Sequence, residues 1–410
     1  MTRILEIVRR KLRDPANAPP LRIAVLGGTF AEGEGCAVAS VAIPEGSIMA
    51  NPSYCAWPYR LQGFLNQLMG GIQWVEVTNL AEEGTDTGFM TPLLRNWIYP
   101  DALLPHGPDI IVNAYGKYDY TNYGEEPPPD LVNTIQTEMT DFLRSIQASH
   151  PCGDAPVVIH MDDVGVNLDE EPGILFSTRH VQAFNKAMSA DNHAHENFAM
   201  AGHMAMTWTL AFCALEMALQ HCETTAKTIT PLPEPKRNCQ DPSTGDPSCA
   251  FAFFAGPQGT VKRVTEFQKY IQPFTQSNSG WRVLTDMSTG WSRKTGLVAV
   301  SPQASIIFSI KDIDRPVQFF HLMTLKSSAE PWRDGKAMFR VAILPPNKGK
   351  PMETSFVIDG KHDGGEQHIT HHFNVDFEDS HKAPVGSDIM LSVELIEGTS
   401  FKVLGLMLCS

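Results

Sequence analysis

The sequence has no long apolar run and little basic charge, and these absences exclude two classes of protein. No segment of the 410 residues approaches the roughly 18 consecutive apolar residues that a bilayer-spanning helix needs. We therefore do not expect an integral membrane protein. The chain carries 32 Lys and Arg against 46 Asp and Glu, a formal net charge of −14. Because such a surface repels nucleic-acid phosphates, we do not expect nucleic-acid binding.

Cysteine pairs at metal-binding spacing are also absent. None of the eight cysteines forms a Cys-x-x-Cys pair, the main signature of a structural zinc site or a thioredoxin-type redox site. Four histidines remain as candidate metal ligands, but they alternate along predicted strands and would point to opposite faces. They are His362, His368, His371 and His372. We therefore expect neither a metal nor a cofactor.

The even number of cysteines favours disulfides. Cys239 and Cys249 close a short polar loop, and we predict a bridge between them. A second bridge, from Cys222 to Cys409, would join the end of a predicted helix to the end of the chain. Cys213 lies within an apolar helix pattern, which is typical of a buried free thiol.

Disulfides predict a secreted, endomembrane or cell-surface protein, because they form in oxidising compartments. The first twelve residues are basic and amphipathic. They do not form a signal peptide, which needs an apolar core and a small-residue cleavage site. Two alternatives follow: a leader was removed during maturation, or the chain is intracellular.

The first half of the chain alternates strand and helix patterns. Short apolar runs are typical of buried parallel strands, and segments with apolar residues at helical spacing separate them. The predicted strands are 22–27, 73–80, 108–114 and 155–161, and the predicted helices are 57–68, 131–146 and 200–222. This alternation favours an α/β fold with a doubly wound parallel sheet and flavodoxin-like layers, which we assign to residues 1–223.

The second half of the chain has a different texture. Residues 224–279 are rich in Pro, Ser, Asp and Gly, and we interpret them as a linker with a small disulfide loop. Over residues 280–410, about eight short apolar runs are separated by Gly, Pro and Asp turns, without helical spacing. This pattern predicts an all-β sandwich or jelly-roll domain.

The most informative segment for function joins the first predicted strand to the next helix. The strand ends in Gly27 and Gly28, and Thr29 follows at the start of the helix. That order places a hydroxyl side chain at the carboxyl edge of the parallel sheet, where open α/β proteins bind ligands. The simpler alternative is that Thr29 only caps the helix.

The segment Val25–Gly33 resembles the first block of SGNH/GDSL hydrolases. It is similar to the algal-type members, in which a Gly-Cys pair follows this block, here Gly35 and Cys36. The resemblance covers about residues 20–222, and the C-terminal sandwich resembles the β domain appended in those members. It also implies a disulfide between Cys36 and Cys55, which match a cysteine pair of the family.

In this family a serine is the nucleophile and fixed donors stabilise the oxyanion, because acyl transfer needs an activated hydroxyl and preorganised N–H groups. The resemblance implies Thr29 as the nucleophile and Gly84 as a backbone oxyanion donor. It also places Tyr118 and Asp119 in the third block, Gly-x-Asn-Asp. This chain departs from the family here, because Thr29 replaces serine and Tyr118 replaces the asparagine donor.

The last block of the family is Asp-x-His followed by Gly-His, and its histidine is the general base. The corresponding segment places His195 at the aspartate and Asn197 at the histidine, with His203 in the Gly-His pair. An alternative anchoring uses Asp191 and His193, which are in a usable order but two residues apart. His203 is also typical of a hydrogen-bonded structural histidine.

These departures favour a catalytically degenerate SGNH-hydrolase-like protein, a binding or structural module in a complex or at a carbohydrate surface. The alternative is an active esterase that removes O-acyl groups from a carbohydrate. A third hypothesis is a lectin-like protein, with Trp281, Trp291 and Trp332 of the β domain as stacking platforms. These hypotheses imply a carbohydrate or a protein as the partner.

Overall fold

A computed structural model shows two compact units. The parallel-sheet unit comprises Met1–Glu82, Asp101–Thr121 and Pro127–Thr244, and the β unit comprises Glu83–Pro100, Asn122–Glu126 and Gly245–Ser410. The structure describes residues 11, 13–14, 17–33, 56–68, 70–82, 85–95, 108–116, 119, 130–148, 156–161, 174–177, 249–254, 267–286, 294–328, 330–346, 351–362, 367–374 and 383–409.

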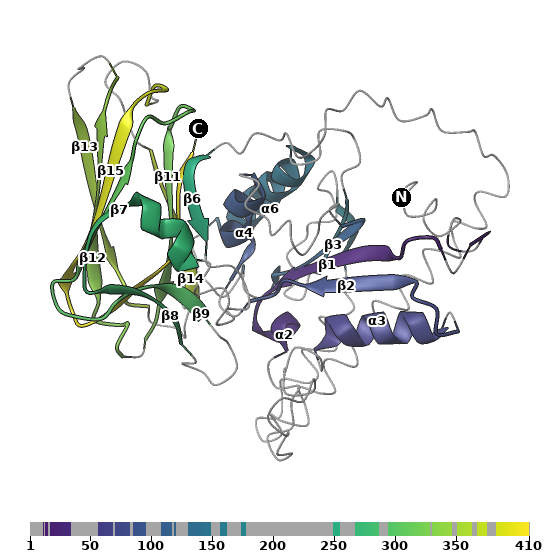
Figure 1. Cartoon of the computed structure of the whole chain (residues 1–410). Coiled ribbons are helices and arrows are strands. Elements are labelled where there is room, and N and C mark those ends of the chain that lie inside the picture. The colour runs from purple at the N-terminus through teal and green to yellow at the C-terminus, as the bar shows by residue number, and fades with distance from the viewer. Residues whose placement is uncertain are drawn as a thin grey trace. The chain divides into compact units, whose positions relative to one another are not determined.

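Five parallel strands form the sheet of the first unit, in the order β2-β1-β3-β4-β5 (Figure 1). These are β1 (Leu21–Gly27), β2 (Val75–Asn79), β3 (Ile110–Ala114), β4 (Val157–His160) and β5 (Ile174–Ser177). The helices are α2 (Thr29–Glu32), α3 (Trp57–Leu68) and α6 (Leu131–Ala148). The predicted parallel α/β sheet is confirmed, and β5 is a strand that the sequence pattern did not reveal.

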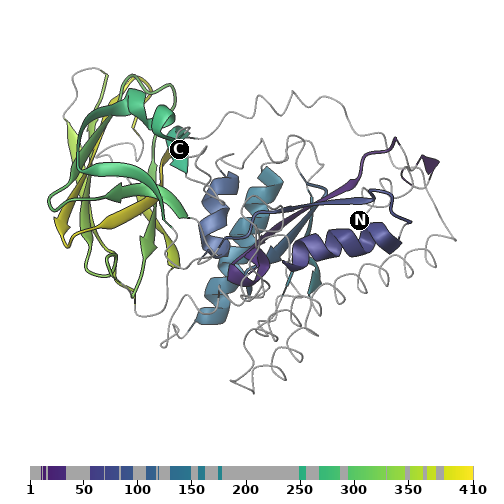
Figure 2. The same ribbon diagram turned by 60° about the horizontal axis from the view of Figure 1, so that its bottom comes forward.

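Alternation along the strands directs side chains to helices on opposite faces of the sheet. On one face Val112 of β3 packs in a cluster with Trp57 and Leu61 of α3. Asn113, the next residue, points to the other face, where its Nδ2 lies 3.9 Å from the Sδ of Met139 in α6. Figure 2 shows α3 running alongside β2, its neighbour in the fold. The sheet is therefore covered on both faces, as parallel sheets usually are.

The β unit is built on two antiparallel sheets. One has the order β13-β12-β15-β10-β7 and the other β14-β11-β16-β9-β8, with β6 also paired to β16. The strands are β6 (Cys249–Phe254), β7 (Thr275–Ser279), β8 (Trp281–Asp286), β9 (Lys294–Ala299), β10 (Ser305–Ile310), β11 (Phe319–Lys326), β12 (Lys336–Leu344), β13 (Met352–Asp359), β14 (Gln367–Asn374), β15 (Asp388–Glu397) and β16 (Phe401–Cys409). The predicted all-β character of this part is confirmed.

Aromatic side chains fill the core between the two sheets. Along β10, β12 and β15 every second residue is buried, so one face of each strand points into the core. Phe339 lies at the centre, with ring centroids 6.4 Å from Phe320 and 6.1 Å from Phe401. Removal of this aromatic surface from water is the main driving force for the sandwich.

Strand β16 differs from its neighbours because all its residues are buried. It pairs with β11 along one side and with β9 and β6 along the other. Its single charged residue, Lys402, places Nζ 5.6 Å from the ring centroid of Trp332, a cation–π contact that compensates for burial of the ammonium group. The near-continuous apolar run of this strand follows from its central position.

The segment predicted to be a linker contains regular structure. Strands β6 and β7 fall within residues 224–279, and residues 267–271 are helical and lead into the short 3-10 helix η4 (Gln272–Phe274). Phe251 of β6 and Phe267 both belong to the sandwich core. The polar composition of the segment concealed these few apolar residues, which are enough to add a strand to the sheet.

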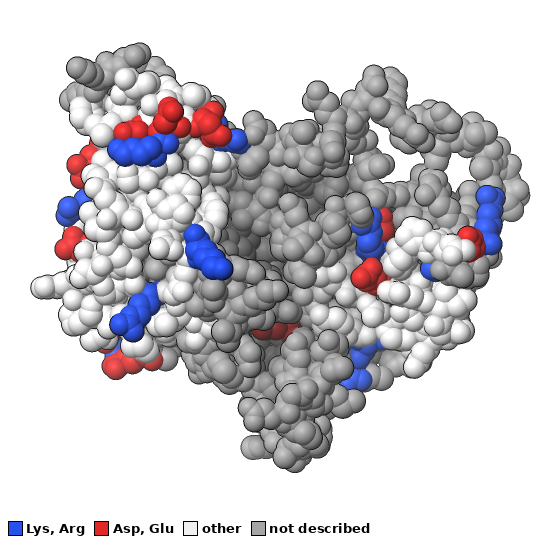
Figure 3. Space-filling model, in the orientation of Figure 1, with Lys and Arg blue, Asp and Glu red and all other residues white. Residues whose placement is uncertain are grey.

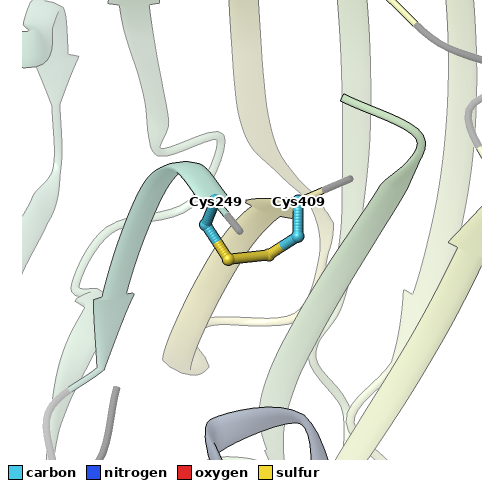
Figure 4. Close-up of a disulfide and its surroundings, with 2 residues drawn as sticks. All are labelled: Cys249 and Cys409. Carbon is cyan, nitrogen blue, oxygen red and sulfur yellow. A yellow bond between two sulfur atoms is a disulfide. The ribbon is translucent and has the colours of Figure 1, made fainter. Parts of the chain in front are cut away.

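Two predicted disulfides are wrong, because Cys249 is bonded to Cys409 (Figure 4). The two cysteines are partners in the antiparallel pairing of β6 with β16, although they are 160 positions apart in the sequence. The bridges Cys239–Cys249 and Cys222–Cys409 are therefore both excluded. Loop spacing favoured a local partner for Cys249, whereas strand pairing decides the real one. The predicted Cys36–Cys55 bridge lies outside the described residues.

One helix from the first half of the sequence belongs to the β unit. Helix α4 (Thr87–Arg95) follows β2 in the chain, yet it lies next to β14. Asp86 caps its first turn, with Oδ1 accepting the Phe89 N–H at 2.6 Å. Phe89 and Met90 are both buried. The β unit is thus discontinuous in sequence.

Candidate functional site at the carboxyl edge of the parallel sheet

The turn after β1 carries the candidate nucleophile. Thr29 is the first residue of α2, directly after Gly27 and Gly28. A Cβ atom at Gly27 would lie 2.7 Å from the Ala31 Cβ and 3.1 Å from the Ala114 carbonyl oxygen. The first of these contacts is too short for a side chain and the second is tight, so glycine at this position allows α2 and the end of β3 to approach β1 closely.

The strand order identifies this turn as the expected position of a ligand site. The chain passes from β1 to β2 on one side of β1, and β3 lies on the other side. In open α/β sheets the connections diverge at such a point, and the crevice beyond the strand ends accommodates ligands. Thr29 and the segment after β3 therefore lie at the same edge of adjacent strands.

The carboxyl end of β2 is hydrogen-bonded to the same turn. The N–H of Leu80 donates to the Val25 carbonyl at 2.8 Å, and the N–H of Glu82 donates to the Gly27 carbonyl at 2.9 Å. Asn79, the last residue of β2, donates from Nδ2 to the Ala31 carbonyl at 2.8 Å. The loop after β2 is thus held against both β1 and α2.

The third predicted block begins at the carboxyl end of β3. Asn113 accepts the Tyr115 N–H through Oδ1 at 3.1 Å, which turns the chain at the strand end. The Asp119 N–H then donates to the Tyr115 carbonyl at 2.8 Å. Asp119 itself is only 1% exposed. Its carboxylate is therefore an interior group of this edge and not a solvated surface charge.

His160 is a buried residue of this edge that sequence reasoning missed. It is the last residue of β4 and pairs in register with Asn113 of β3. Among the described residues its Nδ1 has no hydrogen-bond partner. Burial lowers the pKa of His160 from 6.5 to about 4, because the charged imidazolium loses its hydration. The available signal was a lone histidine at the end of an apolar run.

We expect the buried imidazole of His160 to make stability depend on pH. Its pKa is lower in the folded chain than in the unfolded one, so the unfolded chain binds more protons between pH 6.5 and about 4. The unfolding free energy should therefore fall as the pH is lowered through this window, by about 3 kcal/mol in all. Urea unfolding of the wild type and His160→Gln at several pH values measures the difference.

A variant without a titratable group provides the control for this experiment. Val158 is buried in β4, the same strand as His160. Val158→Ala should lower the unfolding free energy at every pH and keep the pH slope of the wild type, whereas His160→Gln should flatten it. Parallel curves for the wild type and His160→Gln would contradict the assignment.

The structure places only part of the predicted site. Thr29 and Asp119 follow the adjacent strands β1 and β3 and share the carboxyl edge. The other predicted site residues lie outside the described residues and remain predictions. These are Gly84, Tyr118, His195, Asn197 and His203.

The tryptophans predicted as sugar-stacking platforms are largely inside the β unit. Trp281 is 2% exposed and Trp332 is 8% exposed. A platform needs an open ring face, so this prediction is wrong for both residues. Trp291 lies outside the described residues. The sequence shows that tryptophans are present but not whether their rings face solvent, and burial decides that.

On the face drawn in Figure 3, charges of both signs are interspersed among the described residues. Several form local pairs, such as Lys336 with Glu397 at 2.7 Å and Lys311 with Asp388 at 2.8 Å.

Within the described residues, no group of three or more His, Cys, Asp or Glu side chains could hold a metal ion. No helix in that part of the chain is long and apolar enough to cross a membrane.

Comparison with known proteins gives weak likenesses in solved structures. No family model matches the sequence, and no curated protein matches it. The psychrotrophic esterase EstA from Pseudoalteromonas sp. is 16% identical with a TM-score of 0.23, over 34% of this chain and 58% of that chain. An alpha/beta hydrolase from the metagenome of Lake Arreo, Spain, is 13% identical with a TM-score of 0.31, over 46% and 92%.

A carbohydrate-binding module is also similar to this chain. The module from Cellvibrio mixtus lichenase 5A, solved with cellotriose, is 10% identical with a TM-score of 0.23, over 40% of this chain and 98% of that chain. The structural neighbours thus include hydrolases and a carbohydrate-binding module. Because these likenesses are so low, the function proposed below rests on the residues of this chain.

Proposed function

We propose that this chain is an SGNH-hydrolase-like protein that binds an acylated carbohydrate at the carboxyl edge between β1 and β3, with little or no turnover. The observation that supports it is the Gly27 turn, which brings α2 and its first residue, Thr29, to the point where the sheet connections diverge. A hydroxyl there can donate to the carbonyl oxygen of an ester.

The departures from the family motif support weak catalysis. Thr29 has a β-branched side chain with a restricted χ1 angle. Tyr118 stands in place of the amide donor, and loss of one oxyanion donor costs about 100-fold to 1000-fold in rate. Asn197 cannot accept a proton as an imidazole does. A binding role, at a carbohydrate surface or within a complex, needs none of these groups to be reactive.

An active esterase is the second candidate. The contacts that hold the Thr29 turn, which are the close approach at Gly27 and the hydrogen bond from the Glu82 N–H to the Gly27 carbonyl, serve ester binding with or without turnover. What favours the esterase is that residue 29 keeps a hydroxyl group, which a nucleophile requires. The esterase would remove O-acyl groups from a carbohydrate, with a histidine such as His193 or His203 as the base.

Variants at Thr29 test both candidates. We expect wild-type hydrolysis of p-nitrophenyl acetate to be close to background, and binding of acetylated xylan oligosaccharides to be measurable by calorimetry. Thr29→Ala should weaken that binding about two- to tenfold, the effect of one hydrogen bond. Thr137→Ala is a matched control, because Thr137 donates only to the Asn133 carbonyl on the exposed side of α6.

The results separate the two candidates. Rapid wild-type turnover that Thr29→Ala abolishes would establish the esterase and refute the degenerate site. Turnover that appears only in Thr29→Ser would show that a base is present and that the threonine limits the reaction. Absence of binding to acetylated and plain xylan alike would contradict the proposed function.

A further inference from the structure

Asn79 links two segments of the candidate site that are far apart in sequence. It is the last residue of β2 and is 4% exposed. Its Oδ1 accepts the Ala81 N–H at 3.1 Å, and its Nδ2 donates to the Ala31 carbonyl of α2 at 2.8 Å. One buried amide therefore shapes the loop after β2 and also reaches the helix that begins at Thr29.

Helix α2 depends on such external contacts. It has four residues, and the Glu32 N–H donates to the carbonyl of Gly28, the residue before the helix, at 3.0 Å. A helix of one turn is unstable in isolation, because nucleation fixes several residues in return for one hydrogen bond. The last carbonyls of any helix also lack partners within it. Asn79 satisfies one of these carbonyls, that of Ala31.

Asn113 provides an internal comparison. It lies near the end of β3, is fully buried, and accepts the N–H two residues later just as Asn79 does. Its amide points instead to the Met139 Sδ of α6, at 3.9 Å. The two asparagines thus share the same turn at a strand end, but the Asn79 amide donates to α2 whereas the Asn113 amide lies next to α6.

We propose that Asn79 is a positioning residue, whose amide donor fixes α2 and with it the backbone of Thr29 at the ligand edge. Its role in ligand binding rests on the proposed function, whereas its hydrogen bond to α2 does not. Since Asn79 also shapes the loop that leads to Glu82, a single side chain sets the relative positions of α2 and the loop after β2.

Hydrogen exchange in the full chain, without any ligand, measures how far Asn79 stabilises α2. In Asn79→Ala, the amides of the peptide covering residues 27–33 should exchange about ten- to a hundredfold faster, because a buried carbonyl loses its donor. Asn66→Ala is the matched control, because the Asn66 amide bonds the backbone of Trp74 and Val75 at the opposite end of β2, and it should leave this peptide close to the wild type. Asn79→Asp keeps the acceptor for Ala81 and loses the donor, so it should behave like Asn79→Ala.

Ligand binding is measured on the same variants with acetylated xylan oligosaccharides. Asn79→Ala should weaken binding by tenfold or more, and Asn66→Ala should not. If exchange in residues 27–33 is unchanged in both Asn79 variants, or if Asn79→Asp matches the wild type, the positioning role is overturned. If exchange rises as expected but the wild type binds no xylan, the positioning role stands and the proposed function fails. If Asn79→Ala does not fold, Asn79→Asp decides.

Discussion

Replacement of both Cys249 and Cys409 by serine is expected to lower the unfolding free energy of the β unit by about 4 to 5 kcal/mol. The bridge joins positions 160 residues apart and so removes much of the freedom of the unfolded chain. For a unit of this size, that loss corresponds to a fall in melting temperature of roughly 10 °C or more. Differential scanning calorimetry under non-reducing conditions measures it.

Serine replacement of Cys36 and Cys55 is the control for this measurement. These cysteines belong to the parallel-sheet unit, so the melting transition of the β unit should be unchanged in that variant. A reductant should lower the melting temperature of the β unit in the wild type. It should leave that temperature unchanged in the double variant of Cys249 and Cys409. Equal melting temperatures for the double variant and the wild type would show that the bridge does not stabilise the unit. Free thiols at both positions in protein from its natural source would overturn the oxidising compartment that we propose.

Phe89→Ala is expected to destabilise the β unit, although residue 89 lies in the first half of the sequence. Phe89 is 1% exposed and belongs to α4, which lies next to β14. Truncation of a buried phenylalanine typically costs about 3 to 5 kcal/mol. Hydrogen exchange should therefore become faster in β11, which pairs with β14, and in β16, which follows β11 in that sheet.

Leu61→Ala gives the matched comparison. Leu61 of α3 is buried in the cluster of the parallel sheet. Its truncation should accelerate exchange in β1 and β3 and leave β16 unchanged. If Phe89→Ala instead accelerated exchange in β1 and left β16 unchanged, α4 would not be part of the β unit. The positive result would show that residues 87–95 must be included in any expressed form of the β unit.

Local patterns were sufficient to predict most of the fold. The strands around Val25 and Val112 are continuous apolar runs, and β10 and β12 alternate, so periodicity alone reveals them. Helix α3 was predicted with its observed bounds, because its apolar residues recur at helical spacing. In each case the residues that specify the element are contained within it.

The misses share one physical cause, which is that tertiary partners decide them. Cys249 pairs with Cys409 because two strands meet, and nothing near Cys249 in the sequence indicates that. Helix α4 is apolar and follows a parallel strand, so its pattern is equally consistent with packing on either unit. At the candidate site the family motif suggested Thr29 and Asp119, whereas the hydrogen bonds of Asn79 and the burial of His160 come from the folded structure.

The central position of β16 has a consequence for biosynthesis. Strand β16 pairs with β6, β9 and β11, and it is the last of the described strands to leave the ribosome. At a translation rate of about 5 to 20 residues per second, the thiol of Cys249 must wait roughly 8 to 30 s for its partner 160 positions later. Cys239 leaves the ribosome before Cys249 and is ten positions from it in the sequence. In an oxidising compartment the nascent chain would be open to mispairing during this interval, and a disulfide isomerase would correct it.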